Sequence, residues 1–435
     1  MWAIEISLGI DRTSSAGALF LIAFAGITYY VAEILLTGYY GMRSDRIGVK
    51  PVILYATIGA GIVLLLYAPS SLIFIEFGHE TAGLLLMTLY LAIIHFIHGV
   101  FASAKVAPSL GFINHYSTSE NRTLHMAWYD NAILYGRAAG IMFGGFLWIV
   151  FEVDKVPFED QAAQIAKTFP ILSILMIIAV GLVVFGLKDY QGEPAPAKSF
   201  SIKQDVRIAA KVMFEEKRRP MLLPWISIAA LIGSASLWGP TVSFIVSGES
   251  DSDRGYNALL PIIVILVGLA LPAPFWGIYA DRKGRKKTLL IGLFGMPIAG
   301  VVGLVVGYPF YKDDVSISNP YLLLSIMPAT FLFSALIPVL MGILGDTAEE
   351  NQDGKVMSGY HFVIATGEIV GILIGGIVIA LFSFVQSRTR IFGEGESGTN
   401  IAITLGFVLF EGILVVAMII GIYRLPEESK YGTNV

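Results

Sequence analysis

The sequence predicts an all-α membrane protein made of two related helical halves. Of its 435 residues, 55% are hydrophobic and only 14% are charged, a balance that a water-soluble protein of this size cannot bury. The apolar residues come in runs of about 20, the length of helix that crosses a bilayer core. A charged, glycine-containing motif follows one such run in each part of the chain. A repeat of such long period in a hydrophobic chain is typical of two homologous bundles.

Eleven apolar segments are predicted to be membrane-spanning helices. Proline and glycine interrupt several of them, which bundles in lipid tolerate because neighbouring helices satisfy the freed backbone groups. The expected helices cover residues 16–40, 52–68, 82–107, 124–151, 168–187, 221–247, 257–280, 288–308, 320–344, 357–385 and 401–423.

Basic residues are concentrated in alternate connections between these helices. Most of the 29 Lys and Arg residues fall in one set of loops and in the tail after residue 423, whereas the other set is mainly acidic. Since Lys and Arg are retained on the cytoplasmic side, we expect a multi-pass protein of the cell (cytoplasmic) membrane. Its cytoplasmic loops are then residues 41–51, 105–122, 188–220, 281–287 and 345–356.

The longest of these loops divides the chain. It opens with a Pro-, Gly- and Ala-rich stretch over residues 191–196, a composition typical of a linker. Residues 201–219 then have the pattern of a short basic amphipathic helix lying on the membrane surface. The expected domains are an N-terminal bundle over 1–187, a linker over 188–220, a C-terminal bundle over 221–424 and a cytoplasmic tail over 425–435.

The start of the chain departs from the repeat. Trp2 matches Trp238 at the offset that relates the two motif copies, and Trp238 falls late in the expected helix over 221–247. The first half therefore has no counterpart of residues 220–237. We expect a truncated or mis-assigned first helix. The alternative is a protein of eleven helices with an external N-terminus, although repeated halves usually match in helix number.

The repeated motif carries glycine, aspartate and arginine at fixed spacing. Glycine permits close backbone approach and unusual dihedral angles. An aspartate can accept hydrogen bonds from the free N–H groups at the start of a neighbouring helix, where the helix dipole favours an anion. If that neighbour belongs to the other half, the contact closes the cytoplasmic side; the alternative is a plain topology signal. The motif residues are Gly41, Asp45, Arg46 and Gly48, and then Gly277, Asp281, Arg282, Gly284 and Arg285.

Two rows of glycine at four-residue spacing lie on two of the expected helices. Such rows place the glycines on one helix face and allow close helix–helix packing. Sliding of the two halves along these faces is the functional alternative. The rows are Gly136, Gly140 and Gly144, and Gly367, Gly371 and Gly375.

These features together resemble the major facilitator superfamily of secondary transporters. The doubled loop motif carries the resemblance, with Val49 and Pro51 standing in the first copy where the family prefers basic residues. The glycine rows are similar to the family pattern Gly-x-x-x-Gly-Pro-x-x-Gly-Gly, with Ile141 and Ile372 in place of proline. His95 stands where the family's helix 4 normally has arginine.

The resemblance implies twelve helices, a central cavity between the halves and alternating access. It also implies that Asp45 meets the start of helix 11 and that Asp281 meets the start of helix 5. Helices 2 and 11 flank each other in this family. The residues that line the cavity are then expected among those that follow.

Ionisable residues at membrane depth are functional candidates by default. Glu33 and Glu368 are expected at similar depth on helices 2 and 11. Two close carboxylates in low dielectric do not both ionise easily, so one of them can carry the coupling proton. A static bridge between Glu368 and Arg137 is the alternative. The full set is Glu33, Asp130, Arg137, His361 and Glu368.

Aromatic and histidine side chains supply candidates for a substrate cavity. Histidine as a residue type titrates near physiological pH, but a helical histidine often only forms a hydrogen bond. The tryptophans at 128 and 276 are better explained by the membrane interface or by core packing. The candidates are Tyr29, Tyr30, His95, His98, Tyr135 and Trp238.

Several classes of function are excluded or disfavoured. The chain has no cysteine, which excludes disulfides and thiolate catalysis, and it has no phosphate-binding loop of the ATPase type. We expect no enzymatic activity, no cofactor, no metal and no nucleic-acid partner.

The remaining interpretation is a monomeric secondary transporter that contacts membrane lipids and moves a small solute together with protons or another ion. Export of drug-like or metabolite compounds is slightly favoured. The alternatives are uptake of an organic solute, such as a sugar or an organic acid, and a membrane sensor or scaffold that does not transport.

Overall fold

The computed structural model describes residues 15–70, 81–152, 164, 166–188, 202–246, 263–295, 298, 320–349, 352–389, 391 and 395–425. These residues form helices and short connections. The helices of the first part are α2 (Ser15–Ile47), α3 (Val49–Tyr67), α5 (Thr81–Tyr116), α6 (Arg122–Val150) and α8 (Thr168–Gly186). The later ones are α9 (Ile202–Phe214), η2 (Arg219–Met221), α10 (Leu222–Val246), α12 (Ala273–Lys283), α13 (Arg285–Leu293), α16 (Pro320–Phe333), α17 (Leu336–Gly345), α18 (Asp353–Thr389) and α19 (Gly395–Tyr423).

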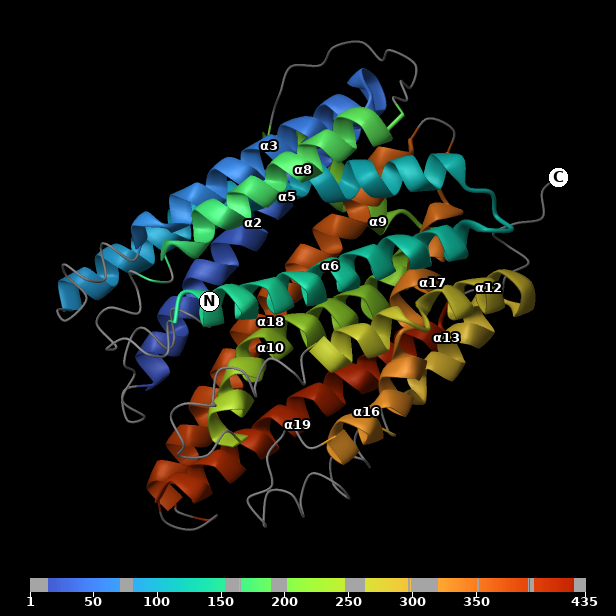
Figure 1. The fold of residues 1–435 in the computed structure, drawn as a ribbon. Helices are drawn as coiled ribbons and strands as arrows, with labels where there is room; N and C mark the ends of the chain where they lie inside the picture. The colour runs from blue at the N-terminus through green and yellow to red at the C-terminus, as the bar shows by residue number, and fades with distance from the viewer. Residues whose placement is uncertain are drawn as a thin grey trace.

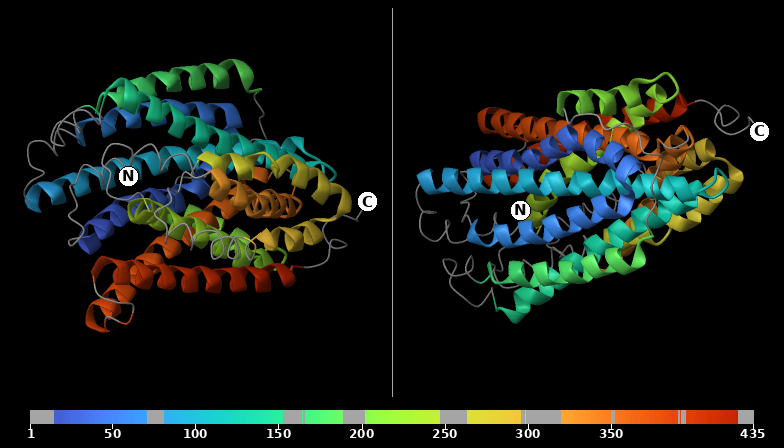
Figure 2. Two further views of the ribbon diagram at one scale, coloured as in Figure 1. Left: turned by 60° about the horizontal axis from the view of Figure 1, so that its bottom comes forward. Right: turned by 90° about the horizontal axis from the view of Figure 1, so that it is seen from above.

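The axes of most of the long helices are roughly aligned with one another, although the chain runs in opposite directions along some of them (Figures 1 and 2). Helices α2, α3, α5 and α8 pack together, and α10 packs with both α18 and α19. The first and later parts of the chain meet where α18 contacts α2 and α5, and where α6 contacts α12 and α17. These contacts form the seam, the interface between the helices of the first part and those of the later part. Two helix groups that share such an interface are the arrangement expected of a duplicated bundle.

Six helical segments in the described part are long and apolar enough to cross a membrane: Val49–Tyr67, Leu85–Tyr116, Thr168–Gly186, Ile263–Lys283, Met327–Gly345 and Asp353–Gln386. Helix α8 buries none of its residues within the protein, and its Phe185 is 90% exposed. A helix so apolar on all sides is stable only in lipid. The all-α membrane fold expected from the sequence is therefore confirmed.

Two helices continue beyond their expected ends. Helix α2 extends through residue 47 and α5 through residue 116, so most of the expected loop over 105–122 is helical. The apolar runs stop before the helices do, because backbone hydrogen bonding continues through the polar residues beyond them. Gly41, Asp45 and Arg46 accordingly lie within the C-terminal part of helix α2 and not in the loop that follows it.

The expected helix over 320–344 is interrupted. Helix α16 ends at Phe333 and α17 begins at Leu336. Pro338 has no backbone N–H and cannot bond to the carbonyl of Ser334 four residues earlier, which breaks the regular ladder at this point. The described residues of the expected helices over 257–280 and 288–308 are helical apart from turns at 271–272 and 294; the remainder of both segments lies outside the described residues.

The amphipathic linker helix is present as α9, but its apolar face does not lie on a membrane surface. Ala209, Val212 and Met213 are buried, and α9 packs against α2 and α18. A carbon added at Gly38 of α2 would lie 2.5 Å from the carbonyl oxygen of Asp205, which shows how closely the helices approach. The linker thus crosses the seam at one end of the molecule.

Candidate functional site

The first aspartate of the repeated motif binds the start of another helix. Asp45, near the end of α2, accepts hydrogen bonds from the backbone N–H groups of Gly354 at 2.9 Å and Lys355 at 3.1 Å. Helix α18 begins at Asp353, so both donors belong to its first turn, where N–H groups have no intrahelical acceptor. The carboxylate also lies at the positive end of the helix dipole.

The second copy repeats this contact. Asp281, near the end of α12, accepts from the N–H groups of Thr123 at 3.2 Å and Leu124 at 3.0 Å. Helix α6 begins at Arg122, so the geometry matches that of Asp45. These are the two contacts implied by the family resemblance, since α18 and α6 correspond to helices 11 and 5.

The motif glycines have two different roles. Gly48 and Gly284 have φ angles of 96° and 107° and form the turns, a conformation that strains residues with a side chain. Gly41 and Gly277 are helical and permit close approach instead. A carbon added at Gly41 would lie 2.4 Å from the carbonyl oxygen of Gly354, and one at Gly277 would lie 2.8 Å from Cα of Leu124.

Arg285 alone of the three motif arginines pairs with a motif aspartate in the described structure. Its Nη2 lies 3.3 Å from Oδ1 of Asp281, and its Nε donates to Thr123 Oγ1 at 2.8 Å. It also pairs with Asp346. Arg46 is half-buried and Arg282 is exposed.

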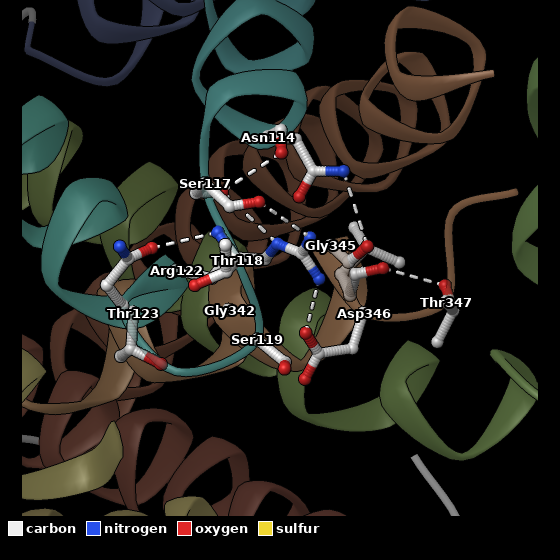
Figure 3. Close-up of polar contacts among 12 residues, drawn as sticks. Asn114, Ser117, Thr118, Ser119, Arg122, Thr123, Gly342, Gly345, Asp346 and Thr347 are labelled. Carbon is white, nitrogen blue, oxygen red and sulfur yellow. Dashed lines mark hydrogen bonds and ion pairs between the residues drawn. The ribbon is translucent and has the colours of Figure 1, made fainter. Parts of the chain in front are cut away.

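A polar cluster around Asp346 joins α5, α6 and α17, and sequence reasoning missed it (Figure 3). Arg122 and Arg285 both pair with Asp346. Asn114 donates to the carbonyl oxygen of Gly345 at 3.3 Å and also contacts Asp353. The available signal was modest: charged residues at the ends of expected helices, without motif spacing.

The linker is anchored by a buried arginine. Arg218 is 3% exposed, and it donates from Nε to Thr347 Oγ1 at 2.9 Å and from Nη2 to the Thr347 carbonyl oxygen at 2.8 Å. Burial lowers the pKa of Arg218, and the nearby Glu215 and Glu349 oppose that change. On the surface beside it, the hydrogen bond from Lys217 lowers the pKa of Glu349.

At membrane depth, a histidine and a carboxylate meet across the seam. His361 of α18 lies with Nε2 3.0 Å from Oε1 of Glu33 on α2. The residues are 5% and 3% exposed. An ion pair so well buried is costly to leave half-made, because the remaining charge would have no partner.

Glu368 follows His361 by about two helical turns on the same face of α18. It is 9% exposed, and it shares a hydrogen bond with the hydroxyl of Tyr30, while Tyr29 is hydrogen-bonded to Glu33. Glu33 and Glu368 lie within range of electrostatic interaction with each other. The two carboxylates are therefore neighbours, with His361 and two tyrosines between the helices that carry them.

Helix α6 adds Asp130 and Arg137 near this cluster. The charge of Arg137, which is exposed, acts on Asp130 and on Glu368. Within the described residues Arg137 and Glu368 form no direct ion pair, so the static bridge considered from the sequence is absent. The buried carboxylate that does have a basic partner is Glu33, and that partner is His361 and not Arg137.

The cavity candidates separate into two groups. His98 contacts Tyr67 through Nδ1 at 3.3 Å and packs edge-to-face on Tyr29, which links it to the cluster. His95 donates from Nδ1 to the carbonyl oxygen of Leu91, 2.9 Å away in its own helix. Tyr135 is 40% exposed on α6. The side chain of Trp238 lies outside the described residues.

The two glycine rows differ. On α18, a carbon added at Gly367 would lie 2.5 Å from Cβ of Ala229, and one at Gly371 would lie 2.1 Å from the carbonyl oxygen of Ala230. Both neighbours belong to α10, and Gly375 is also buried. On α6, no described atom lies within 4 Å of a carbon added at Gly136, Gly140 or Gly144. The packing role expected for both rows is thus seen only on α18.

Comparisons with known proteins agree with this architecture. The chain is 30% identical over 166 residues to the multidrug resistance protein MdtG of Yersinia enterocolitica. This alignment covers 37% of each of the two chains. It is 25% identical over 151 residues to the multi-drug resistance efflux pump PmrA of Streptococcus pneumoniae, covering 34% of this chain and 35% of that one. The matched regions thus span little more than a third of these relatives.

Two solved structures share the fold over 97% of this chain and 89% of their own, each at 16% identity. One is the human organic anion transporter MFSD10, with a TM-score of 0.59, and the other is the proton:xylose symporter XylE, with a TM-score of 0.63. The family model described as Major Facilitator Superfamily matches residues 2–273 and 258–434. With the doubled aspartate contact and the shared fold, this match establishes that the chain belongs to the Major Facilitator Superfamily.

Proposed function

We propose that this chain is a proton-coupled secondary transporter of the cell membrane that moves a small organic solute by alternating access. The observation that carries the proposal is the buried contact between Glu33 on α2 and His361 on α18. It joins helices from the two parts of the chain at membrane depth, where ionisable groups mark ion pathways.

The chemistry of this pair suits coupling. With Glu33 ionised and His361 protonated, the charges compensate each other and hold α2 against α18. A proton added to Glu33 leaves the imidazolium buried without a partner, which is costly in low dielectric. Protonation therefore favours separation of the two helices. Glu368, with its Tyr30 hydrogen bond, supplies a second carboxyl that can accept the proton.

The contacts of Asp45, Asp281 and Asp346 support a gate at one end of the bundle. Each joins a helix of the first part to a helix of the later part. Because this end carries most of the basic residues, it faces the cytoplasm in the proposal. The structure then corresponds to the state that is closed on the inside. The N-terminal helices through residue 187 and the C-terminal helices from residue 221 form the two rocking units.

The names of the relatives favour export over uptake. MdtG and PmrA are named for multidrug resistance or efflux, which supports a drug-like or metabolite substrate. XylE is named a proton:xylose symporter, and this supports uptake of an organic solute as the second candidate. A sensor that keeps the fold without transport is the candidate of another class.

The test uses purified protein in liposomes with an imposed pH gradient and two probes, ethidium and radiolabelled xylose. Export predicts that ethidium moves against its gradient when the opposite side is acidic. One proton adds about 1.4 kcal/mol of driving force per pH unit, so the steady-state accumulation ratio of the solute is expected to rise by up to about tenfold with a one-unit gradient. Movement of xylose alone would favour uptake, and specific binding without flux of either probe would favour the sensor.

The matched variants are Glu33→Gln and Glu368→Gln, with Glu216→Gln on the exposed surface of the linker as control. At least one of the first two is expected to abolish the dependence on the pH gradient, because glutamine cannot carry a titrating proton. Glu216→Gln is expected to behave as the parent. Unchanged gradient dependence in both buried variants would remove these residues from the coupling mechanism.

A further inference from the structure

A fourth carboxyl at membrane depth lies outside the site described above, which contains Glu33, Asp130 and Glu368. Glu411 of α19 contacts the hydroxyl of Ser234 on α10 through Oε1. Ser234 stands twelve residues after the start of α10 at Leu222, and Glu411 stands twelve residues before the end of α19 at Tyr423. At about 1.5 Å per residue, both lie about 18 Å from the inner ends of their helices, near the middle of a bilayer core.

The contact belongs to the regular packing of the two helices. Ten residues away along both, a carbon added at Gly421 would lie 2.5 Å from Cδ of Pro224. Antiparallel helices in fixed register bring Glu411 opposite Ser234 by the same alignment. The pairing is therefore determined by the backbone and not by a surface rotamer.

The hydroxyl of Ser234 has two oxygen neighbours and one hydrogen. Its Oγ lies 2.9 Å from the carbonyl oxygen of Leu231, and it also contacts Glu411. A hydroxyl donates only once. If Ser234 donates to Leu231, the contact with Glu411 requires a proton on the carboxyl. If Glu411 is ionised, Ser234 must donate to it and leave Leu231. Both contacts are satisfied together only by protonated Glu411.

The surroundings offer no compensating positive charge. Helix α10 carries no ionisable residue between 222 and 246. On α18, which also packs on α19, the groups at this depth are His361 and Glu368, engaged with Glu33 and Tyr30. Lys286 of α13 reaches the carbonyl oxygen of Leu425, beyond the inner end of α19.

At the same inner end, η2 contributes the exposed Arg219, and α18 begins with Asp353 and Lys355, while Arg388 lies near its opposite end. In the described part of the chain none of these charges pairs with Glu411. An unpaired carboxylate at this depth is costly, and the neutral acid avoids the cost.

We propose that Glu411 is a further proton-binding carboxyl, separate from Glu33 and Glu368, and that its protonation changes the hydrogen bond to the hydroxyl of Ser234. It is separated from the Glu33–His361–Glu368 cluster by α10: a carbon added at Gly233 would lie 2.3 Å from the carbonyl oxygen of Glu368, while the next residue, Ser234, faces Glu411. A shift of α10 against α18 changes the surroundings of both carboxyls at once.

The test is infrared difference spectroscopy of the full chain in liposomes between acidic and alkaline pH, which needs no substrate. Wild type is expected to show a protonated-carboxyl band with a component that Glu411→Gln removes. Ser234→Ala should shift that component to higher frequency without removing it, because the acid loses its hydrogen bond, and Ser234→Thr should restore the position. Glu216→Gln, on the exposed linker, is the control for surface carboxyls.

The proposal is overturned if the difference spectrum is unchanged by Glu411→Gln, or if Ser234→Ala leaves the band in place. If Glu411→Gln does not fold, the comparison of Ser234→Ala with Ser234→Thr decides whether the carboxyl band belongs to Glu411. This outcome is independent of the proposed transport, since Glu33→Gln and Glu368→Gln must leave the Glu411 component intact. Absence of gradient-driven flux in the unmodified protein, with the Glu411 component present, would count against the proposed transport only.

Discussion

Asp45 and Asp281 each accept hydrogen bonds from backbone N–H groups that have no acceptor within their own helix. The first N–H groups of α18 and α6 have no carbonyl within their own helices, and each aspartate supplies both acceptor oxygens from another helix. A hydrogen bond to a charged group contributes about 1.5–3 kcal/mol. The two contacts are therefore large enough to bias an equilibrium between closed and open states.

Replacing Asp45 by asparagine should weaken this closure. Asparagine keeps one acceptor but loses the charge, and a loss of about 1.4 kcal/mol would change accessibility roughly tenfold. The chain has no cysteine, so Ser44→Cys provides a single thiol at a position that is 1% exposed beside Gly354. Its maleimide labelling rate in liposomes should rise in the Asp45→Asn background.

Ser119→Cys, on an exposed residue, is the control and should label at one rate in both backgrounds. An unchanged rate for Ser44→Cys would show that Asp45 does not hold the end closed. The same comparison applies to Asp281→Asn, where the contact is made with α6.

At the scale of elements, the two glycine rows show what the spacing of small residues leaves undecided. At Gly367 and Gly371 of α18, atoms of α10 already fill the space that a side chain would need, whereas the row on α6 meets no described atom. The same spacing therefore occurs on a packed face and on a face that meets no atom of the described residues. Spacing places residues on a face, but the neighbour comes from the fold.

Alanine substitution should separate the two rows. At Gly371, the added carbon collides with the carbonyl oxygen of Ala230 at 2.1 Å, and forcing such a contact costs about 1–3 kcal/mol. At Gly140, alanine adds no collision and improves helix propensity by up to about 1 kcal/mol. Thermal unfolding in detergent should show a lower midpoint for Gly371→Ala and an equal or higher one for Gly140→Ala. Equal losses at both positions would contradict this reading.

For the whole molecule, several separate contacts hold together the end of the bundle that carries the repeated motif, which is the closed cytoplasmic end in the proposed mechanism. Asp45 meets α18, Asp281 meets α6, Asp346 gathers two arginines, and α9 crosses from α2 to α18. The linker is held by Arg218, whose guanidinium binds Thr347 and Glu215. A rocking motion must break or carry along each of these contacts.

Removing the anchor should free the linker. Arg218→Gln loses the ion pair and most of the buried hydrogen bonds, and leaves polar partners unsatisfied at a cost of about 1–3 kcal/mol. Limited trypsin digestion should then cleave at the exposed Lys211 and Lys217 several times faster than in the parent. Arg207→Gln, at an exposed arginine of α9 in the same linker, is the matched control at which the rate should not change. Equal rates for both variants would exclude an anchoring role.

Part of the candidate site was visible in the sequence and part was not. The fixed spacing of Asp45 and Asp281, read with the family resemblance, led to contacts that the structure contains. Glu33, His361 and Glu368 stood out because charges are rare in apolar helices. Which of them touch was not visible: the sequence suggested paired carboxylates or a bridge to Arg137, and the structure pairs Glu33 with His361. Asp346 and Glu411 carry no motif and were missed.

The sequence by itself determined the helical membrane fold, the repeat, and the residues too polar for lipid. Hydropathy and spacing are properties of one segment, and a segment's cost in lipid does not depend on its neighbours. Only the tertiary structure decided which charge meets which helix end, which glycine row is packed, and that Ser234 faces Glu411. Those outcomes depend on the register and rotation of one helix against another, which arise from contacts between residues far apart in the chain.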